Sequence, residues 1–155
     1  MGFRAQAPAP ARPKLYERDM YRWTRQQARL LRAGRMSELD LENLAAEIES
    51  LGNRDYRELR SRLELILLHL LKWQFQPEKR SGSWRSTIRI QHGEVDTLLK
   101  QSPSLRRRVA PFVAEVYPAA AASAADETGL DESTFPRACP YTPEQALGPD
   151  FMPKD

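Results

Sequence analysis

Cysteine is nearly absent from this sequence, in which Cys139 is the single example among 155 residues. A lone cysteine excludes a disulfide within the chain and is typical of the reducing cytoplasm. Long hydrophobic runs are absent too, since no apolar stretch approaches the ~20 residues that cross a bilayer. Residues 1–13 combine arginine, alanine and proline without an apolar core, so we expect no secretory signal. The sequence therefore predicts a cytoplasmic protein outside the membrane.

Histidine is scarce as well, with only His69 and His92 in the chain. Neither has a second histidine at the i,i+4 spacing of a helical metal pair. The chain contains no glycine-rich phosphate loop, no Gly-x-Ser-x-Gly and no internal repeat. We therefore predict no catalytic residue, no metal and no cofactor. His69 lies within a leucine run, where a hydrogen-bonded core histidine is favoured over a catalytic base, and Cys139 is interpreted as an unreactive thiol.

The feature that dominates the sequence is its leucine-dense middle, residues 53–76. Apolar side chains fall at helical spacing on almost every side of this segment. They are Tyr56, Leu59, Leu63, Leu65, Ile66, Leu67, Leu68, Leu70, Leu71 and Trp73. Asn53 is expected to cap the helix, and Pro77 is expected to end it near Gln76. Because a helix that is apolar nearly all round must be surrounded, the pattern predicts an all-α bundle around one long central helix.

Two amphipathic helices are predicted before this segment. The first covers residues 16–34, where Gly34 provides the left-handed residue that commonly ends a helix. The second covers residues 40–51, with Asp40 as its N-cap and Gly52 as its stop, although a competing capping box starts at Ser37. Its expected buried stripe consists of Leu41, Leu44, Ala45, Ile48 and Leu51.

Charge is distributed in blocks of alternating sign, which the net charge of +3 conceals. Residues 1–35 and 79–108 carry +7 and +6, whereas residues 36–78 and 109–155 carry −4 and −6. Such blocks suit helices that pair along their edges better than a protein wholly devoted to nucleic acid. Arginines in the first block recur every three or four residues and form one helical stripe: Arg18, Arg22, Arg25, Arg29 and Arg32. This arginine stripe indicates either a phosphate-binding surface or a solvated face paired with the acidic helix that follows.

Tryptophans and basic residues are interleaved around the turn that follows the central helix. The set, which we call the tryptophan corner, is Lys72, Trp73, Lys79, Arg80, Trp84, Arg85 and Arg89. Aromatic rings among cations are what a stacking and phosphate-binding surface requires. Two tryptophans that close a helical hairpin, with cations as a solvated rim, explain the pattern equally well. Ser81 or Ser83 is expected to cap the next helix, whose buried stripe is Trp84, Ile88, Val95, Leu98 and Leu99.

Prolines shape the last third of the chain. After a start signal at Pro103, the interior prolines Pro111 and Pro118 predict a helix that is kinked or broken before it ends near Thr128. Gly129 is its expected left-handed stop.

Residues 131–155 contain five prolines and are expected to form an extended tail. A capping box at Thr142 predicts one or two helical turns within it. Four spaced apolar residues are expected to anchor the tail to the bundle: Phe135, Tyr141, Leu147 and Phe151.

Several phrases of the sequence carry a resemblance to a known family. They are Tyr16-x-x-Asp19-x-Tyr21-x-Trp23, residues 37–44 and 47–52, His69-Leu70-Leu71-Lys72-Trp73-Gln74-x-Gln76-Pro77, Ser83-Trp84-Arg85-x-Thr87-Ile88, Ser102-Pro103-Ser104-Leu105 and Tyr141-Thr142. Together they resemble the bacterial family known as domain of unknown function twenty-nine, over roughly residues 15–153. The resemblance implies an all-helical cytoplasmic bacterial protein and imports no activity. Members are usually continuously helical after Ser102, so the two interior prolines are departures.

These observations predict a single-domain helical bundle over residues 15–130, preceded by a disordered tail at residues 1–14 and followed by a proline-rich tail at residues 131–155 that packs on the bundle. The leading functional hypothesis is a non-enzymatic protein–protein interaction module that forms a homo-oligomer or binds another protein. Binding of nucleic acid or another polyanion through the arginine stripe or the tryptophan corner is the alternative. An enzyme with His69 as its base is a third, less favoured hypothesis.

Overall fold

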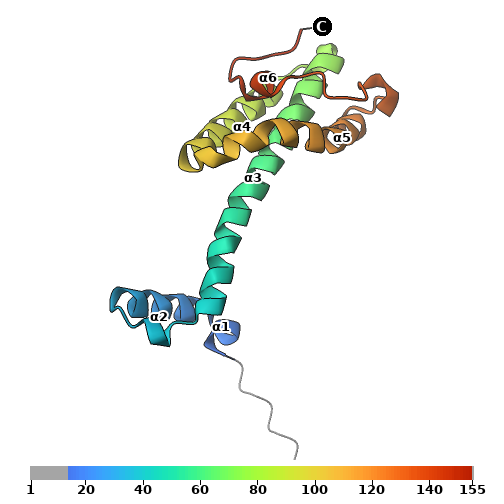
Figure 1. Ribbon diagram of the computed structural model, residues 1–155. Helices are drawn as coiled ribbons and strands as arrows, with labels where there is room; N and C mark the ends of the chain where they lie inside the picture. Colours follow the sequence, from blue (N-terminus) through green and yellow to red (C-terminus); the bar gives the residue numbers. More distant parts are fainter. Residues whose placement is uncertain (1–13, 155) are drawn as a thin grey trace, which may run out of the picture. The chain divides into compact units, whose positions relative to one another are not determined.

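The computed structural model describes residues 14–154. Over this range the elements are six α-helices and four short 3-10 helices, without a strand, which confirms the all-α prediction. The chain forms two compact units, divided between Ser50 and Leu51. We call residues 14–50 the N-terminal unit and residues 51–154 the C-terminal unit (Figure 1). The disordered tail expected at residues 1–14 lies, apart from Lys14, outside the described residues.

The N-terminal unit begins with two helices where one was predicted. Helix α1 spans Leu15–Arg18 and α2 spans Met20–Arg32, with Asp19 between them at φ −156° and ψ 86°. The prediction of a single helix over residues 16–34 is therefore wrong. Asp19 breaks it because its carboxylate accepts the backbone N–H of Arg22 at 2.9 Å, which is the N-cap interaction that aspartate favours over a helix interior.

Glycine ends α2 as predicted. Gly34 has a positive φ of 68°, and the backbone N–H of Arg35 donates to the carbonyl of Leu30 at 3.0 Å. This bond and the one from Gly34 to Leu31 form a Schellman motif. The chain then passes through the 3-10 helix η1, Met36–Glu38, and reaches the start of α3.

Polar contacts hold α2 against the start of α3. The indole N–H of Trp23 donates to the carboxylate of Asp40 at 3.2 Å, and the backbone N–H of Asp40 donates to the buried side chain of Gln27 at 2.9 Å. Tyr16 donates its hydroxyl to Glu47. Trp23, Gln27 and Leu30 are the buried residues of α2, so the core of this unit is small and partly polar.

The long helix α3 spans Leu41–Phe75 and contributes to both units. Asp40 precedes it as predicted, but the expected break at Gly52 and Asn53 is wrong, because α3 continues through both residues. A glycine costs a helix interior only about 1 kcal/mol, and good helix formers lie within two residues on either side of Gly52, namely Leu51 and Arg54. Gly52 also lacks the positive φ that would turn the chain back, since Gly34 and Gly129 are the described residues with that conformation.

The C-terminal unit is built on the rest of α3. Helix α4, Gly82–Gln101, and helix α5, Val109–Thr128, pack with α3 in one hydrophobic core and cross it in the view of Figure 1. Most of the apolar residues of α3 that were predicted to be surrounded are buried in this core: Leu59, Leu63, Ile66, Leu67, Leu68, Leu70 and Leu71. Leu65 and Tyr56, which were expected among them, are exposed. Ser81 caps α4 by accepting the N–H of Trp84 at 3.3 Å, one of the two caps expected.

The predicted break at Pro111 or Pro118 is not found, because both prolines lie within one continuous α-helix. Residues Pro103–Arg108 form the 3-10 helix η3, and α5 begins at Val109. Pro111 then falls in the first turn of α5, where a missing N–H costs nothing. Pro118 lies inside α5, which continues to Thr128 and ends at Gly129 with a φ of 72°.

The segment after Gly129 covers the core rather than leaving it. It contains the 3-10 helix η4, Glu132–Thr134, and helix α6, Pro143–Leu147. Thr142 and Gln145 form the predicted capping box. All four apolar residues expected to anchor this segment pack in or against the core, with Phe135 and Tyr141 buried and Leu147 and Phe151 partly buried.

Candidate functional site

The tryptophan corner lies where α3 ends and α4 begins. The 3-10 helix η2, Pro77–Lys79, joins the two helices and brings Trp73 and Trp84 to the same end of the C-terminal unit. The corner therefore exists as the sequence suggested, and its value as a binding surface depends on whether its cations are available.

Lys72 is not available at the surface. Lys72 is only 7% exposed. Its ammonium group lies 4.6 Å from the centre of the Trp84 ring and forms an ion pair with Glu127 of α5. A buried ammonium needs such a partner because burial removes its hydration. Lys72 thus joins α3 to α4 and α5 within the fold.

Arg80 also interacts with a tryptophan of the corner. Its guanidinium lies 5.2 Å from the centre of the Trp73 ring, and its Nε donates to the carbonyl of Trp73 at 2.8 Å. These contacts fit a cation that closes the end of α3 and covers an indole ring. Lys79, by contrast, is exposed.

Arg85 and Arg89 are exposed on α4 and line a cavity of about 280 Å³. Asp150 and Met152 from the C-terminal segment line the same cavity. A carboxylate beside the two arginines weakens their attraction for an added anion. Of the tryptophan corner, the structure therefore leaves Lys79, Arg85 and Arg89 on the surface and uses Lys72 and Arg80 to hold the fold.

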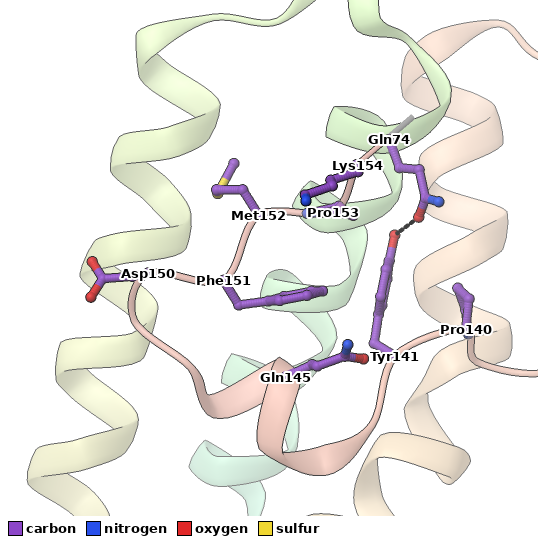
Figure 2. A pocket seen from close by; sticks show the side chains of 9 residues that line it. All are labelled: Gln74, Pro140, Tyr141, Gln145, Asp150, Phe151, Met152, Pro153 and Lys154. Carbon is purple, nitrogen blue, oxygen red and sulfur yellow. Dashed lines mark hydrogen bonds between the residues drawn. The ribbon is translucent and has the colours of Figure 1, made fainter.

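A larger pocket of about 510 Å³ lies between the end of α3 and the C-terminal segment (Figure 2). Its lining is Gln74, Pro140, Tyr141, Gln145, Asp150, Phe151, Met152, Pro153 and Lys154. Tyr141 donates its hydroxyl to Gln74 at 2.7 Å, and its ring meets Phe151 edge to face at 5.9 Å. Burial raises the pKa of the Tyr141 hydroxyl, which holds it in the protonated donor form. Besides these aromatic and amide groups, the lining contains one carboxylate, Asp150, and one ammonium group, Lys154.

The arginine stripe of the N-terminal unit is exposed over its whole length. Arg18 belongs to α1, whereas Arg22, Arg25, Arg29 and Arg32 follow one face of α2. No carboxylate among residues 14–154 forms an ion pair with any of the five guanidinium groups. The expected pairing with the acidic helix that follows is therefore not found within the described chain.

A second surface of the N-terminal unit was missed by sequence reasoning. Leu41 is 65% exposed and Ile48 is 67% exposed, so the prediction that this stripe of α3 is buried is wrong. Ala45, between them on the same helical face, is exposed as well. We call Leu41, Ala45 and Ile48 the apolar face. Four further large apolar residues of this unit are at least 43% exposed: Met20, Tyr21, Leu31 and Met36.

The two histidines and the cysteine each contact a backbone carbonyl. His69 is partly buried and its Nδ1 lies 2.9 Å from the carbonyl of Leu65, while burial lowers its pKa. His92 is buried and its Nε2 lies 2.8 Å from the carbonyl of Ala146. The Sγ of Cys139 donates weakly to the carbonyl of Tyr141, and burial raises the pKa of the thiol. A thiol with a raised pKa is a poor nucleophile at neutral pH.

Residues 14–154 contain no group of three or more histidine, cysteine, aspartate or glutamate side chains arranged to hold a metal ion. No helix within the described range has both the length and the apolar character needed to cross a bilayer.

Residues 15–152 match the model of a protein family described as Domain of unknown function DUF29. No curated protein and no solved structure matches the chain.

Proposed function

This chain belongs to the family described as Domain of unknown function DUF29, and we propose that it is a non-enzymatic protein–protein interaction module that acts through its N-terminal unit. The observation that carries the proposal is the exposure of the apolar face, Leu41, Ala45 and Ile48, on the first turns of α3. The proposal includes the cytoplasmic, bacterial setting and the homo-oligomeric state expected from the sequence.

The composition of the N-terminal unit supports an interaction surface. Single exposed apolar residues are ordinary, but a run of them on one compact unit marks a contact site. Six large apolar side chains of this unit are exposed, whereas its buried apolar residues are Trp23 and Leu30. Water-exposed leucine and isoleucine side chains gain roughly 1.5–3 kcal/mol each when a partner covers them fully.

Photocrosslinking in cells tests the proposal directly. A benzophenone amino acid at Ile48 is expected to give a discrete adduct with a polypeptide, because the apolar face is covered in the working protein. The same amino acid at Ile90 is the matched control, since Ile90 is 55% exposed on α4 of the C-terminal unit. The added substitution Leu41→Glu should abolish the adduct at Ile48. Equal labelling at both positions, or none at Ile48, would contradict the proposal.

Polyanion binding is a second candidate because the arginine stripe is exposed and no described carboxylate pairs with it. Arginines at this spacing follow a phosphate backbone, and binding through them weakens as a power of the salt concentration. Fluorescence anisotropy with DNA and RNA across a salt series measures this dependence. Arg25→Gln with Arg29→Gln should reduce both the affinity and the salt slope, whereas Arg106→Gln with Arg107→Gln, on exposed positions of η3, should not. Absent or salt-independent binding removes this candidate.

A further inference from the structure

We propose that the partner of the apolar face is a second copy of this chain, bound around a two-fold axis so that arginines of α2 in each copy meet Glu42 and Glu49 of α3 in the other. The inference deepens the proposed interaction function and rests on it. Its support comes from the acidic edge of the apolar face and from the opposite charge on α2 of the same unit.

The apolar face is bordered by acidic residues on the same helix. Leu41, Ala45 and Ile48 stand at i, i+4 and i+7 and so share one side of α3. Glu42 and Glu49 follow Leu41 and Ile48 by one residue each, which places both carboxylates along one edge of that side. Both glutamates are exposed. The face therefore combines an apolar centre with a negative edge, as interfaces commonly do. Ala45 at its middle allows close helix contact.

The opposite charge lies on α2 of the same unit. Helix α2 contains Arg22, Arg25, Arg29 and Arg32 and no acidic residue, while residues 41–50 of α3 contain three glutamates and no basic residue. Within one copy these acidic and basic groups form no ion pairs with each other. Glu47 accepts a hydrogen bond from Tyr16, and no described residue pairs with Glu42, Glu49 or the four arginines. Each copy thus presents both halves of a charge-paired interface.

The spacing of the two sets also matches. Glu42 and Glu49 are seven residues apart, as are Arg25 and Arg32, so each pair spans about 10.5 Å along its helix at 1.5 Å per residue. In a two-fold dimer every contact occurs twice, because residue i of one copy meets residue j of the other and the reverse. Two such charge clusters fix the register and orientation of the apolar contact.

A charge-swap experiment on the purified full chain tests this pairing. Sedimentation equilibrium of the unmodified chain should show a dimer at roughly 100 μM, a concentration at which a dimer with a Kd of about 1 μM is largely assembled. Glu42→Lys with Glu49→Lys, and separately Arg25→Glu with Arg32→Glu, should each raise the Kd tenfold or more, because every charge contact becomes repulsive. An equimolar mixture of the two variants should recover a heterodimer with unmodified affinity, since both clusters are again attractive. The effect of each swap should diminish at high salt.

Two controls separate this outcome from misfolding and from general charge effects. Arg106→Glu with Arg107→Glu changes the net charge as much as the arginine swap but lies on η3 of the C-terminal unit, and it should leave the Kd unchanged. Leu41→Glu with Ile48→Glu should give a monomer that no charge-swapped partner rescues. Circular dichroism should show unchanged helicity for all variants, because every substituted residue is exposed.

The possible failures are distinguishable. A monomeric unmodified chain at that concentration, or two swapped variants that fail to recover association when mixed, would overturn the self-pairing. If the benzophenone at Ile48 then still captured a different protein, the interaction function would stand with another partner. If it captured nothing, both proposals would fall.

Discussion

The two units of this molecule differ in how they treat their apolar residues. All 22 residues of the hydrophobic core cluster belong to the C-terminal unit, where four large apolar side chains are exposed. In the N-terminal unit the buried apolar residues are Trp23 and Leu30, and six large apolar side chains are exposed. A helical pattern of leucine and isoleucine thus has opposite outcomes in the two parts of one helix, α3.

The difference shows that an apolar stripe on a helix does not by itself indicate which other segment covers it, or whether one within the chain does. In the C-terminal unit α4, α5 and the segment after Gly129 cover the leucines of α3. In the N-terminal unit α2 contacts α3 through the polar group of Trp23, Gln27 and Asp40, and leaves Leu41 and Ile48 uncovered. The C-terminal unit therefore buries most of its apolar side chains within itself, whereas the N-terminal unit leaves most of its own exposed.

Truncating a core leucine should have the largest effect. Leu67 is 0% exposed, so Leu67→Ala removes its packing and leaves a cavity, at a cost of about 2–5 kcal/mol in the free energy of unfolding. Urea denaturation followed by circular dichroism measures the change. Ile48→Ala is the comparison in the N-terminal unit and should cost less than about 0.5 kcal/mol in dilute solution, where no partner covers the side chain. Equal losses for Leu67 and Ile48 would break the contrast between the units.

Loss of a buried polar contact in the N-terminal unit should have an intermediate effect. Gln27→Leu keeps the size of the side chain but removes the acceptor for the backbone N–H of Asp40. We expect a loss of about 1–3 kcal/mol in the local stability of this unit. Hydrogen exchange of residues 20–45, measured by mass spectrometry, reports it. Gln26→Leu is the matched control, because Gln26 is exposed on the same helix. If both variants exchange alike, the polar contact does not hold α2 to α3.

Acid should destabilise the C-terminal unit through its histidines. Burial lowers the pKa of His92 and of His69 below the ordinary value, so the folded chain binds fewer protons than the unfolded chain. Their contribution is therefore fully present above pH ~6.5, the unfolded value, and is lost progressively as the pH falls below it.

Denaturation midpoints between neutral and mildly acidic pH measure this loss. His92→Gln retains an amide donor for the carbonyl of Ala146 and should flatten part of the pH dependence. Adding His69→Gln should remove the histidine contribution altogether. A double variant with the full original pH dependence would show that other groups are responsible.

The smallest effect is expected at the exposed ion pair between Arg60 and Glu115. Their charged atoms are 2.8 Å apart, yet both side chains are at least 40% exposed. Water and salt screen such exposed pairs, so they contribute little to stability. Arg60→Gln should therefore lower the stability of the C-terminal unit far less than Leu67→Ala does, and added salt should reduce the difference. A loss comparable to that of Leu67→Ala would show that this contact is more important than its exposure indicates.

Much of the fold could be predicted from local chemistry. The cap at Ser81, the left-handed stops at Gly34 and Gly129 and the capping box at Thr142 depend on neighbouring residues alone, and all are present. The buried leucines of α3 were also identified, because that part of the helix is apolar on nearly every side.

The remaining features depend on competition that spacing does not reveal. Asp19 ends α1 because its carboxylate caps the next helix, whereas Gly52 fails to end α3 because helix formers on both sides outweigh its cost. Gln27 is a polar residue among the apolar positions of α2, yet it is buried as a hydrogen-bond acceptor. In the tryptophan corner the sequence identified the cations. It did not predict that Lys72 pairs with Glu127 or that Arg80 binds the carbonyl of Trp73.

The late position of the residues that cover α3 has a consequence for synthesis. Seventy residues separate Leu71 from Tyr141, and both lie in the same core. At about 5–20 residues per second, the ribosome adds Leu71 roughly 4–14 seconds before it adds Tyr141. During that interval the part of the leucine surface that the segment after Gly129 covers is still exposed on the nascent chain, and exposed apolar surface of this kind promotes aggregation.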